Sequence, residues 1–116
     1  MPVPEFKFRH LGINSTDPAT ATDTVSLLCE LFGLEARKLI QSTMVGSDIE
    51  VMDHAEKGQH GHIAFTVSSI PDALNWLASM GWQAEHQNTV HKEDGSLKII
   101  YLSKEIAGFA VHLFEE

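Results

Sequence analysis

Two stretches of the chain carry apolar residues every three or four positions, which is the spacing of one helix face. The first follows Asp17, a capping residue, and stops at Gly33. The second follows Ser69, another capping residue, and stops at Gly81. These boundaries predict one helix over 18–32 and a second that begins near residue 70.

Short apolar and aromatic runs, separated by turn-forming residues, surround both helices and predict strands. The predicted strands span 5–13, 34–40, 42–45, 47–53, 62–67, 82–90, 97–103 and 108–114. The polar stretch 54–60 contains a glycine and predicts a connector. Each half of the chain therefore reads as strand, helix and three strands.

The two halves also match residue by residue. GLEA at 33–36 corresponds to GWQA at 81–84, and GSDIEVM at 46–52 aligns with GFAVHLF at 108–114 without a gap. These matches predict an α+β fold built from two tandem βαβββ modules, against the alternative of two similar halves that arose by chance. The predicted domain covers 1–116, with module one at about 5–53, a linker at 54–60 and module two at about 61–114.

Alternation along the strands places four side chains of metal-ligand type on one face of the sheet. In the strand over 62–67, the large residues Ile63 and Phe65 are expected to pack under the helices, which leaves His62 on the opposite face. The same test gives this inner face His10 with Phe6 and Phe8, Glu50 with Met52, and His112 with Phe114.

One shared metal ion would satisfy all four candidate ligands, His10, Glu50, His62 and His112, which would be costly to leave unpaired beside apolar neighbours. Imidazole and carboxylate ligands without thiolates suit a divalent cation, namely Zn, Ni, Co, Mn or Fe. Three histidines and one glutamate would leave coordination positions open for a substrate. The alternative is that each histidine is an isolated, hydrogen-bonded side chain.

Composition narrows the list of partners. Sixteen acidic residues against eight basic ones give a net charge of -8, which disfavours nucleic acid. The chain has no long apolar run and no leader-like start, so we expect no membrane segment and a cytoplasmic location. A small acidic metabolite remains compatible, because a bound cation would reverse the local field. Glu115 and Glu116 are expected to form a charged tail.

Four stretches, RHLGIN at 9–14, IEVM at 49–52, GHIAFTV at 61–67 and VHLFEE at 111–116, resemble the vicinal-oxygen-chelate superfamily. This superfamily includes glyoxalase I, methylmalonyl-CoA epimerase, extradiol dioxygenases, and fosfomycin- and bleomycin-resistance proteins. The second module is most similar to small glyoxalase-like domains associated with bacterial 2-keto-3-deoxy-6-phosphogluconate aldolases. The resemblance implies a curved mixed sheet or half-barrel with the helices outside, and a homodimer.

The resemblance also implies chemistry. Family members hold a divalent metal on the first and last strands of both modules, here His10, Glu50, His62 and His112. The implied activity is that of a glyoxalase-like lyase or isomerase acting on a small carbonyl or sugar-acid metabolite, with Glu50 or His112 as the catalytic proton carrier. Many catalytic members have glutamate on the last strand, and His112 departs from that pattern.

Two alternatives to catalysis stay open. One is a non-catalytic small-molecule binding module of the bleomycin-resistance type, accessory to a sugar-acid aldolase. The other is a metal-free binder with a pocket lined by Phe6, Phe8, Met52 and Phe114.

Overall fold

All strands in the described part of the chain join one eight-stranded sheet, in which the two modules meet along their first strands. The structure is a computed structural model that describes residues 3–116. Its elements are β1 (Lys7–Ile13), α1 (Pro18–Phe32), β2 (Ala36–Lys38), β3 (Ser42–Val45), β4 (Ile49–Met52), β5 (Gly61–Thr66), α2 (Ile70–Ala78), β6 (Ala84–His91), β7 (Leu97–Leu102) and β8 (Phe109–Phe114).

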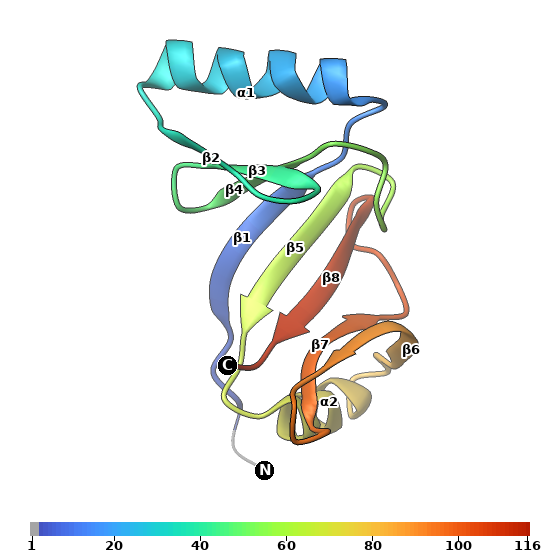
Figure 1. Ribbon diagram of the computed structural model, residues 1–116. Coiled ribbons are helices and arrows are strands. Elements are labelled where there is room, and N and C mark those ends of the chain that lie inside the picture. Colours follow the sequence, from blue (N-terminus) through green and yellow to red (C-terminus); the bar gives the residue numbers. More distant parts are fainter. Residues whose placement is uncertain (1–2) are drawn as a thin grey trace.

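The strand order β2-β3-β4-β1-β5-β8-β7-β6 shows the duplication directly. β1 and β5 run antiparallel at the centre, β4 is parallel to β1, and β8 is parallel to β5. The sheet stays open and curls, with the β2–β4 end beneath α1 and the β6–β7 end beside α2 (Figure 1). The predicted α+β fold of two βαβββ units in a curved mixed sheet is confirmed.

Both helices begin at the residues that the sequence indicated. The Asp17 carboxylate accepts a hydrogen bond from the Thr20 amide at 2.7 Å, and the Ser69 hydroxyl accepts one from the Asp72 amide at 3.2 Å. Gly33 ends α1 with φ of 67°, a left-handed conformation that favours glycine. α2 ends at Ala78 with Ser79 as its C-cap, before the Gly81 that the sequence indicated as its stop.

A separate apolar cluster lies beneath each helix. Ala21, Val45 and Val51 form the buried cluster under α1, and Val67, Ile70, Ala73, Ile100 and Leu113 form the cluster under α2. Both clusters use the same face of the sheet, which we call the outer face. The opposite, concave inner face is therefore free of helices.

One part of the predicted face assignment is wrong, and a β-bulge explains the error. The register between β1 and β5 shifts between Phe8 and His10, so that Arg9 is an extra residue on β1. A bulge of this kind reverses the alternation of side chains along the strand. His10 consequently points to the inner face as predicted, whereas Phe6 and Phe8, which come before the bulge, point to the outer face.

Phe6 and Phe8 therefore belong to the outer face and not to an inner aromatic pocket. Their rings make edge contacts with Phe65, with centroids 6.5 and 6.3 Å apart. Phe6 also packs against the cluster under α2. The alternative of a metal-free pocket lined by Phe6, Phe8, Met52 and Phe114 therefore loses two of its four lining residues.

Glu115 is also more than the tail residue that we expected. Its carboxylate accepts a hydrogen bond from the Ile70 amide at 2.7 Å and lies 2.8 Å from the Lys92 ammonium group. The Lys92 hydrogen bond, followed by that from the Ile70 backbone, lowers the pKa of Glu115. The last strand is thereby joined to the start of α2 and to the β6–β7 hairpin.

The C-terminal half of α1 keeps an exposed apolar surface. Leu27, Leu31 and Phe32 are 56, 68 and 67% exposed. No helix in the described residues is long and apolar enough to cross a membrane. The homodimer implied by the resemblance stays a prediction.

Candidate metal centre

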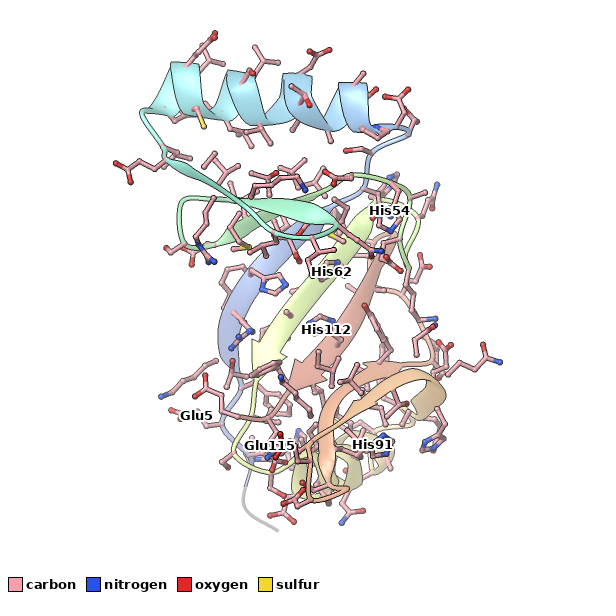
Figure 2. All side chains as sticks on the ribbon, viewed as in Figure 1. Glu5, His54, His62, His91, His112 and Glu115 are labelled. Carbon is pink, nitrogen blue, oxygen red and sulfur yellow. The ribbon has the colours of Figure 1, made fainter. Side chains whose placement is uncertain are left out.

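The four predicted ligands come from four neighbouring strands in the middle of the sheet. Glu50 lies on β4, His10 on β1, His62 on β5 and His112 on β8. Figure 2 shows His62 and His112 at the centre of the sheet, with His54 and His91 toward its two ends. The structure brings all four predicted side chains together on the inner face.

Small residues separate these large side chains across the strands. Gly12 on β1 is the register partner of both Glu50 and His62. Ala64 on β5 stands in the same way between the other two histidines and is fully buried. Each candidate ligand can therefore lean across the small neighbour on the next strand toward a common point.

Gly12 is the tightest of these positions. A Cβ atom on Gly12 would fall inside the contact distance of three atoms of the His62 ring. The His62 ring therefore lies directly against the backbone of β1 at Gly12. No other residue type fits there unless the ring moves.

Three ligand-type atoms converge at distances that suit a metal ion. The Nε2 atoms of His10 and His62 lie 3.1 Å apart, and each lies 3.3 Å from the Glu50 Oε1 atom. Tetrahedral ligands at about 2.0–2.1 Å from an ion are separated by roughly 3.3 Å. His10, His62 and His112 also offer ligand atoms within 4.8 Å of one another. The donor set and spacing fit a divalent cation.

The histidines have fewer polar partners than their burial requires. His62 is 3% exposed and His112 is 7% exposed. In each ring the Nδ1 atom is buried and has no hydrogen-bond partner among the described residues. Buried nitrogens without partners are costly, so a group that satisfies them would stabilise the site.

Glu50 is held as a carboxylate. Its Oε2 atom accepts a hydrogen bond from the Ser42 hydroxyl at 2.7 Å, while Oε1 faces the two histidines. Hydrogen bonds from His10, His62 and then Ser42 hold the pKa of Glu50 well below its usual range. Both oxygens are engaged, which suits a ligand better than a mobile base.

His112 and Tyr101 are held in their neutral forms beside this cluster. Burial, followed by the neighbouring charges of His62 and His10, lowers the pKa of His112 to about 3. Burial, followed by nearby carboxylates, raises the pKa of Tyr101 to about 12. Their ring centroids are 5.1 Å apart, and the two residues are register partners on β8 and β7.

Tyr101 was not among the predicted site residues. The alternation along β7 could have indicated it. Ile100 and Leu102 are buried on the outer face, so Tyr101 between them lies on the inner face. The connector also reaches this edge of the site. Lys57 pairs with Glu85 and lies 5.6 Å from the centre of the Tyr101 ring.

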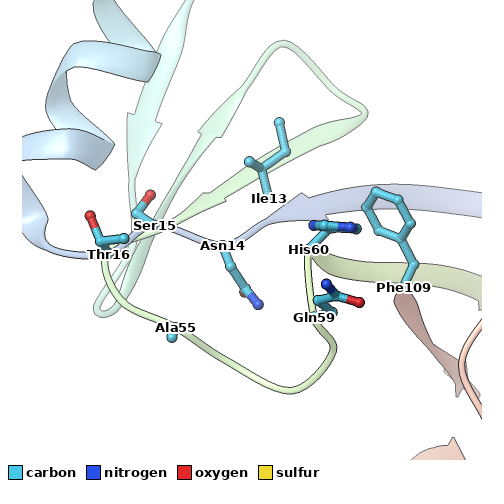
Figure 3. Close-up of a pocket in the computed structure, with 8 residues that line it drawn as sticks. All are labelled: Ile13, Asn14, Ser15, Thr16, Ala55, Gln59, His60 and Phe109. Atoms are coloured by element: carbon cyan, nitrogen blue, oxygen red, sulfur yellow. The ribbon is translucent and has the colours of Figure 1, made fainter. Parts of the chain in front are cut away.

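A separate cavity of about 440 Å³ lies at the start of the connector (Figure 3). It is lined by Ile13, Asn14, Ser15, Thr16, Ala55, Gln59, His60 and Phe109. None of the four candidate ligands lines it. His60 contacts Phe109 there, with ring centroids 5.8 Å apart, and stays outside the histidine cluster.

Solved structures share this arrangement of strands and helices. Methylmalonyl-CoA epimerase from Mycobacterium tuberculosis aligns with a TM-score of 0.65 and 16% identity over 94% of this chain and 87% of that chain. A Streptomyces coelicolor methylmalonyl-CoA epimerase variant in complex with 2-nitronate-propionyl-CoA aligns with a TM-score of 0.65 and 17% identity, over 97 and 99% of the two chains. The chain has the vicinal-oxygen-chelate fold.

A homoprotocatechuate 2,3-dioxygenase variant from B. fuscum shares the fold as well. It aligns with a TM-score of 0.64 and 13% identity over 99% of this chain and 34% of that chain. No protein-family model and no curated protein matches the sequence. At these identities the likeness shows the vicinal-oxygen-chelate fold alone, and the narrower resemblance to aldolase-associated domains stays a prediction.

Replacing Gly12 with alanine is expected to weaken metal binding about 10- to 100-fold, the range for residues that position ligands. The added methyl group would occupy the place of the His62 ring. Calorimetric titration of the metal-free protein with Zn or Ni measures the change. Ser26→Ala, at an exposed position of α1, is the control. Unchanged affinity in Gly12→Ala would refute this role for Gly12.

The metal-free protein is expected to lose about 2 kcal/mol of stability between pH 7.5 and pH 5 through His112 alone. The pKa of His112 is about 3 in the folded protein, against 6.5 as the ordinary value. The unfolded chain therefore binds the extra proton first as the pH falls. Urea denaturation at both pH values measures this loss.

His112→Gln should show a smaller loss than the parent protein by that amount. His86→Gln, at an exposed position, should leave the pH dependence as it is. Equal pH dependence in the parent protein and in His112→Gln would contradict the buried, neutral state of this imidazole.

Proposed function

We propose that this protein is a divalent-metal-dependent lyase or isomerase that moves a proton on a small carbonyl or sugar-acid metabolite. The observation that carries the proposal is the convergence of His10, His62 and Glu50 within 3.3 Å of one another, beside the neutral side chains of His112 and Tyr101. A divalent ion bound there would act as a Lewis acid on a carbonyl or enediolate oxygen.

The protein's own residues divide the remaining tasks. Glu50, with both oxygens engaged, holds the metal together with His10 and His62. The His112 Nδ1 atom is buried and has no hydrogen-bond partner among the described residues. In this proposal His112 is the group that accepts a proton from carbon. Tyr101 keeps its hydroxyl proton at neutral pH, which suits donation of a hydrogen bond to a developing oxyanion. Of the two predicted proton carriers, Glu50 and His112, this division favours His112.

The names of the structural neighbours support an isomerase. Several of them are methylmalonyl-CoA epimerases, and one such structure is a complex with methylmalonyl-CoA. Epimerisation at a carbon next to a carbonyl requires removal and return of a proton. An imidazole and a phenol that lie side by side on one face of the sheet are suited to these two transfers.

One observation favours a second candidate, a binding module without catalysis. Glu50 has no free oxygen, so no carboxylate of the four candidate ligands is available to move a proton. In that case the metal and the inner face would hold a small acid without converting it. The proton-exchange experiment below separates the two candidates.

Protein purified without a histidine tag is expected to contain close to one equivalent of a divalent metal, measured by elemental analysis. The double variant His10→Ala/His62→Ala should lose it, because the converging nitrogens are removed. The matched control is His86→Ala/His91→Ala, at two exposed positions. Failure of the parent protein to bind added Zn, Ni, Co, Mn or Fe would refute the metal centre.

In heavy water, the metal-loaded protein should exchange the hydrogen on the carbon next to the carbonyl of its substrate. Proton nuclear magnetic resonance would follow hemithioacetals of α-ketoaldehydes, sugar acids and methylmalonyl-CoA. His112→Gln should slow this exchange about 10²- to 10⁴-fold while keeping the metal, the usual range for loss of a general acid–base residue.

Tyr101→Phe tests the phenol separately and should slow exchange less than His112→Gln does. Compounds that raise the melting temperature but show no exchange in the parent protein would favour the binding module. Loss of metal in His112→Gln would make His112 a ligand and not the proton carrier.

A further inference from the structure

Arg9 is placed on the inner face by the bulge in β1. It is the extra residue between Phe8 and His10, and its side chain reaches Thr66 on β5, with the guanidinium 3.4 Å from the hydroxyl. Thr66 lies on the same face of β5 as His62, four residues further along the strand. The bulge therefore sets a permanent cation immediately beside a candidate metal ligand.

The guanidinium lies over an aromatic ring. Its central carbon lies 3.7 Å from the centre of the Phe114 ring, and Phe114 is the register partner of Thr66 on β8. Stacking of this kind fixes the plane of the guanidinium and leaves its edge available for hydrogen bonds. A second cation, Lys98, lies 5.7 Å from the same ring.

The Arg9 guanidinium already pairs with a carboxylate of the protein itself, that of Glu116. Glu116 Oε1 lies 3.5 Å from Arg9, with a Glu116 side chain that is 76% exposed. An ion pair with so exposed a partner contributes little stability. A ligand carboxylate that is also held at the metal centre could displace it.

The other charges near this end of the sheet are largely matched. Glu5 lies 3.8 Å from Lys7, and Glu115 lies 2.8 Å from Lys92. Lys98 makes no ion pair within the described residues. The inner face thus carries the Arg9 guanidinium beside the candidate metal centre, in a chain whose net charge is -8.

We propose that Arg9 is a specificity-determining residue that binds an anionic group of the substrate, so that the substrate is a small carbonyl compound bearing a carboxylate. One end of this compound would lie at the histidine cluster and the other at the edge of the Arg9 guanidinium. The inference rests on the proposed function for the first end and on the Arg9–Phe114–Thr66 contacts for the second.

Two kinds of hydroxamate test the two ends separately, on protein loaded with Co(II) and followed by its visible absorption. Acetohydroxamate carries no charge beyond its chelating group and measures the metal centre alone. Hydroxamates that end in a carboxylate, with two, three or four methylene groups between, measure both ends. We expect the best of these to bind parent protein about 10-fold more tightly than acetohydroxamate, the worth of one charge-assisted hydrogen bond.

Arg9→Met should remove this preference and leave acetohydroxamate affinity unchanged, and Arg9→Lys should retain part of it. Glu116→Gln should strengthen binding of the carboxylate probes only, because it removes the internal competitor. The control is Lys104→Met, which removes another cation stacked on an aromatic ring, 5.1 Å from the centre of Trp82.

A carboxylate preference that survives in Arg9→Met would overturn the assignment of Arg9 even if acetohydroxamate binds. Failure of acetohydroxamate to bind the metal-loaded parent protein would instead overturn the proposed function, and the substrate assignment with it. The neutral probe thus distinguishes the two failures.

Discussion

The antiparallel contact between β1 and β5 is the constraint on which the site depends. It brings the first strands of the two modules to the centre of the sheet, where Gly12 and His62 lie opposite each other. With no side chain on Gly12, the His62 ring lies over the neighbouring strand and reaches His10 and Glu50. If the strands were flat and carried large side chains at Gly12 and Ala64, the four candidate ligands would stand too far apart to share an ion.

The sheet also determines which protonation states are available. The helices cover the outer face only, yet His62 and His112 on the inner face are almost completely buried, since neighbouring strands curl around them. Burial keeps His112 neutral, while three hydrogen bonds keep Glu50 charged. Two side chains on the same face of the sheet therefore differ in charge, because His112 is neutral and Glu50 is ionised.

Much of this arrangement could be predicted from the sequence because its causes are local. Caps at Asp17 and Ser69 fixed the helix starts, and strict alternation in β5 and β8 assigned His62 and His112 to the inner face. The duplication supplied the topology. Alternation in β7 indicates the face on which Tyr101 lies, but its place beside His112 comes from the register between β7 and β8. The contacts of Glu115 are likewise made to residues distant in sequence, so neither role follows from one segment alone.

The error at Phe6 and Phe8 has a different origin, since an insertion in the hydrogen-bond ladder leaves no mark in residue types. That insertion divides β1 into two segments with separate duties. Before Arg9 the chain places the rings of Phe6 and Phe8 against Phe65 on the outer face, and after it the strand supplies His10 to the opposite surface. Shortening the strand by one residue at this point would therefore not simply remove a side chain. It would turn one segment over relative to the other, so that the length of β1, as much as its composition, encodes which surface carries the chemistry.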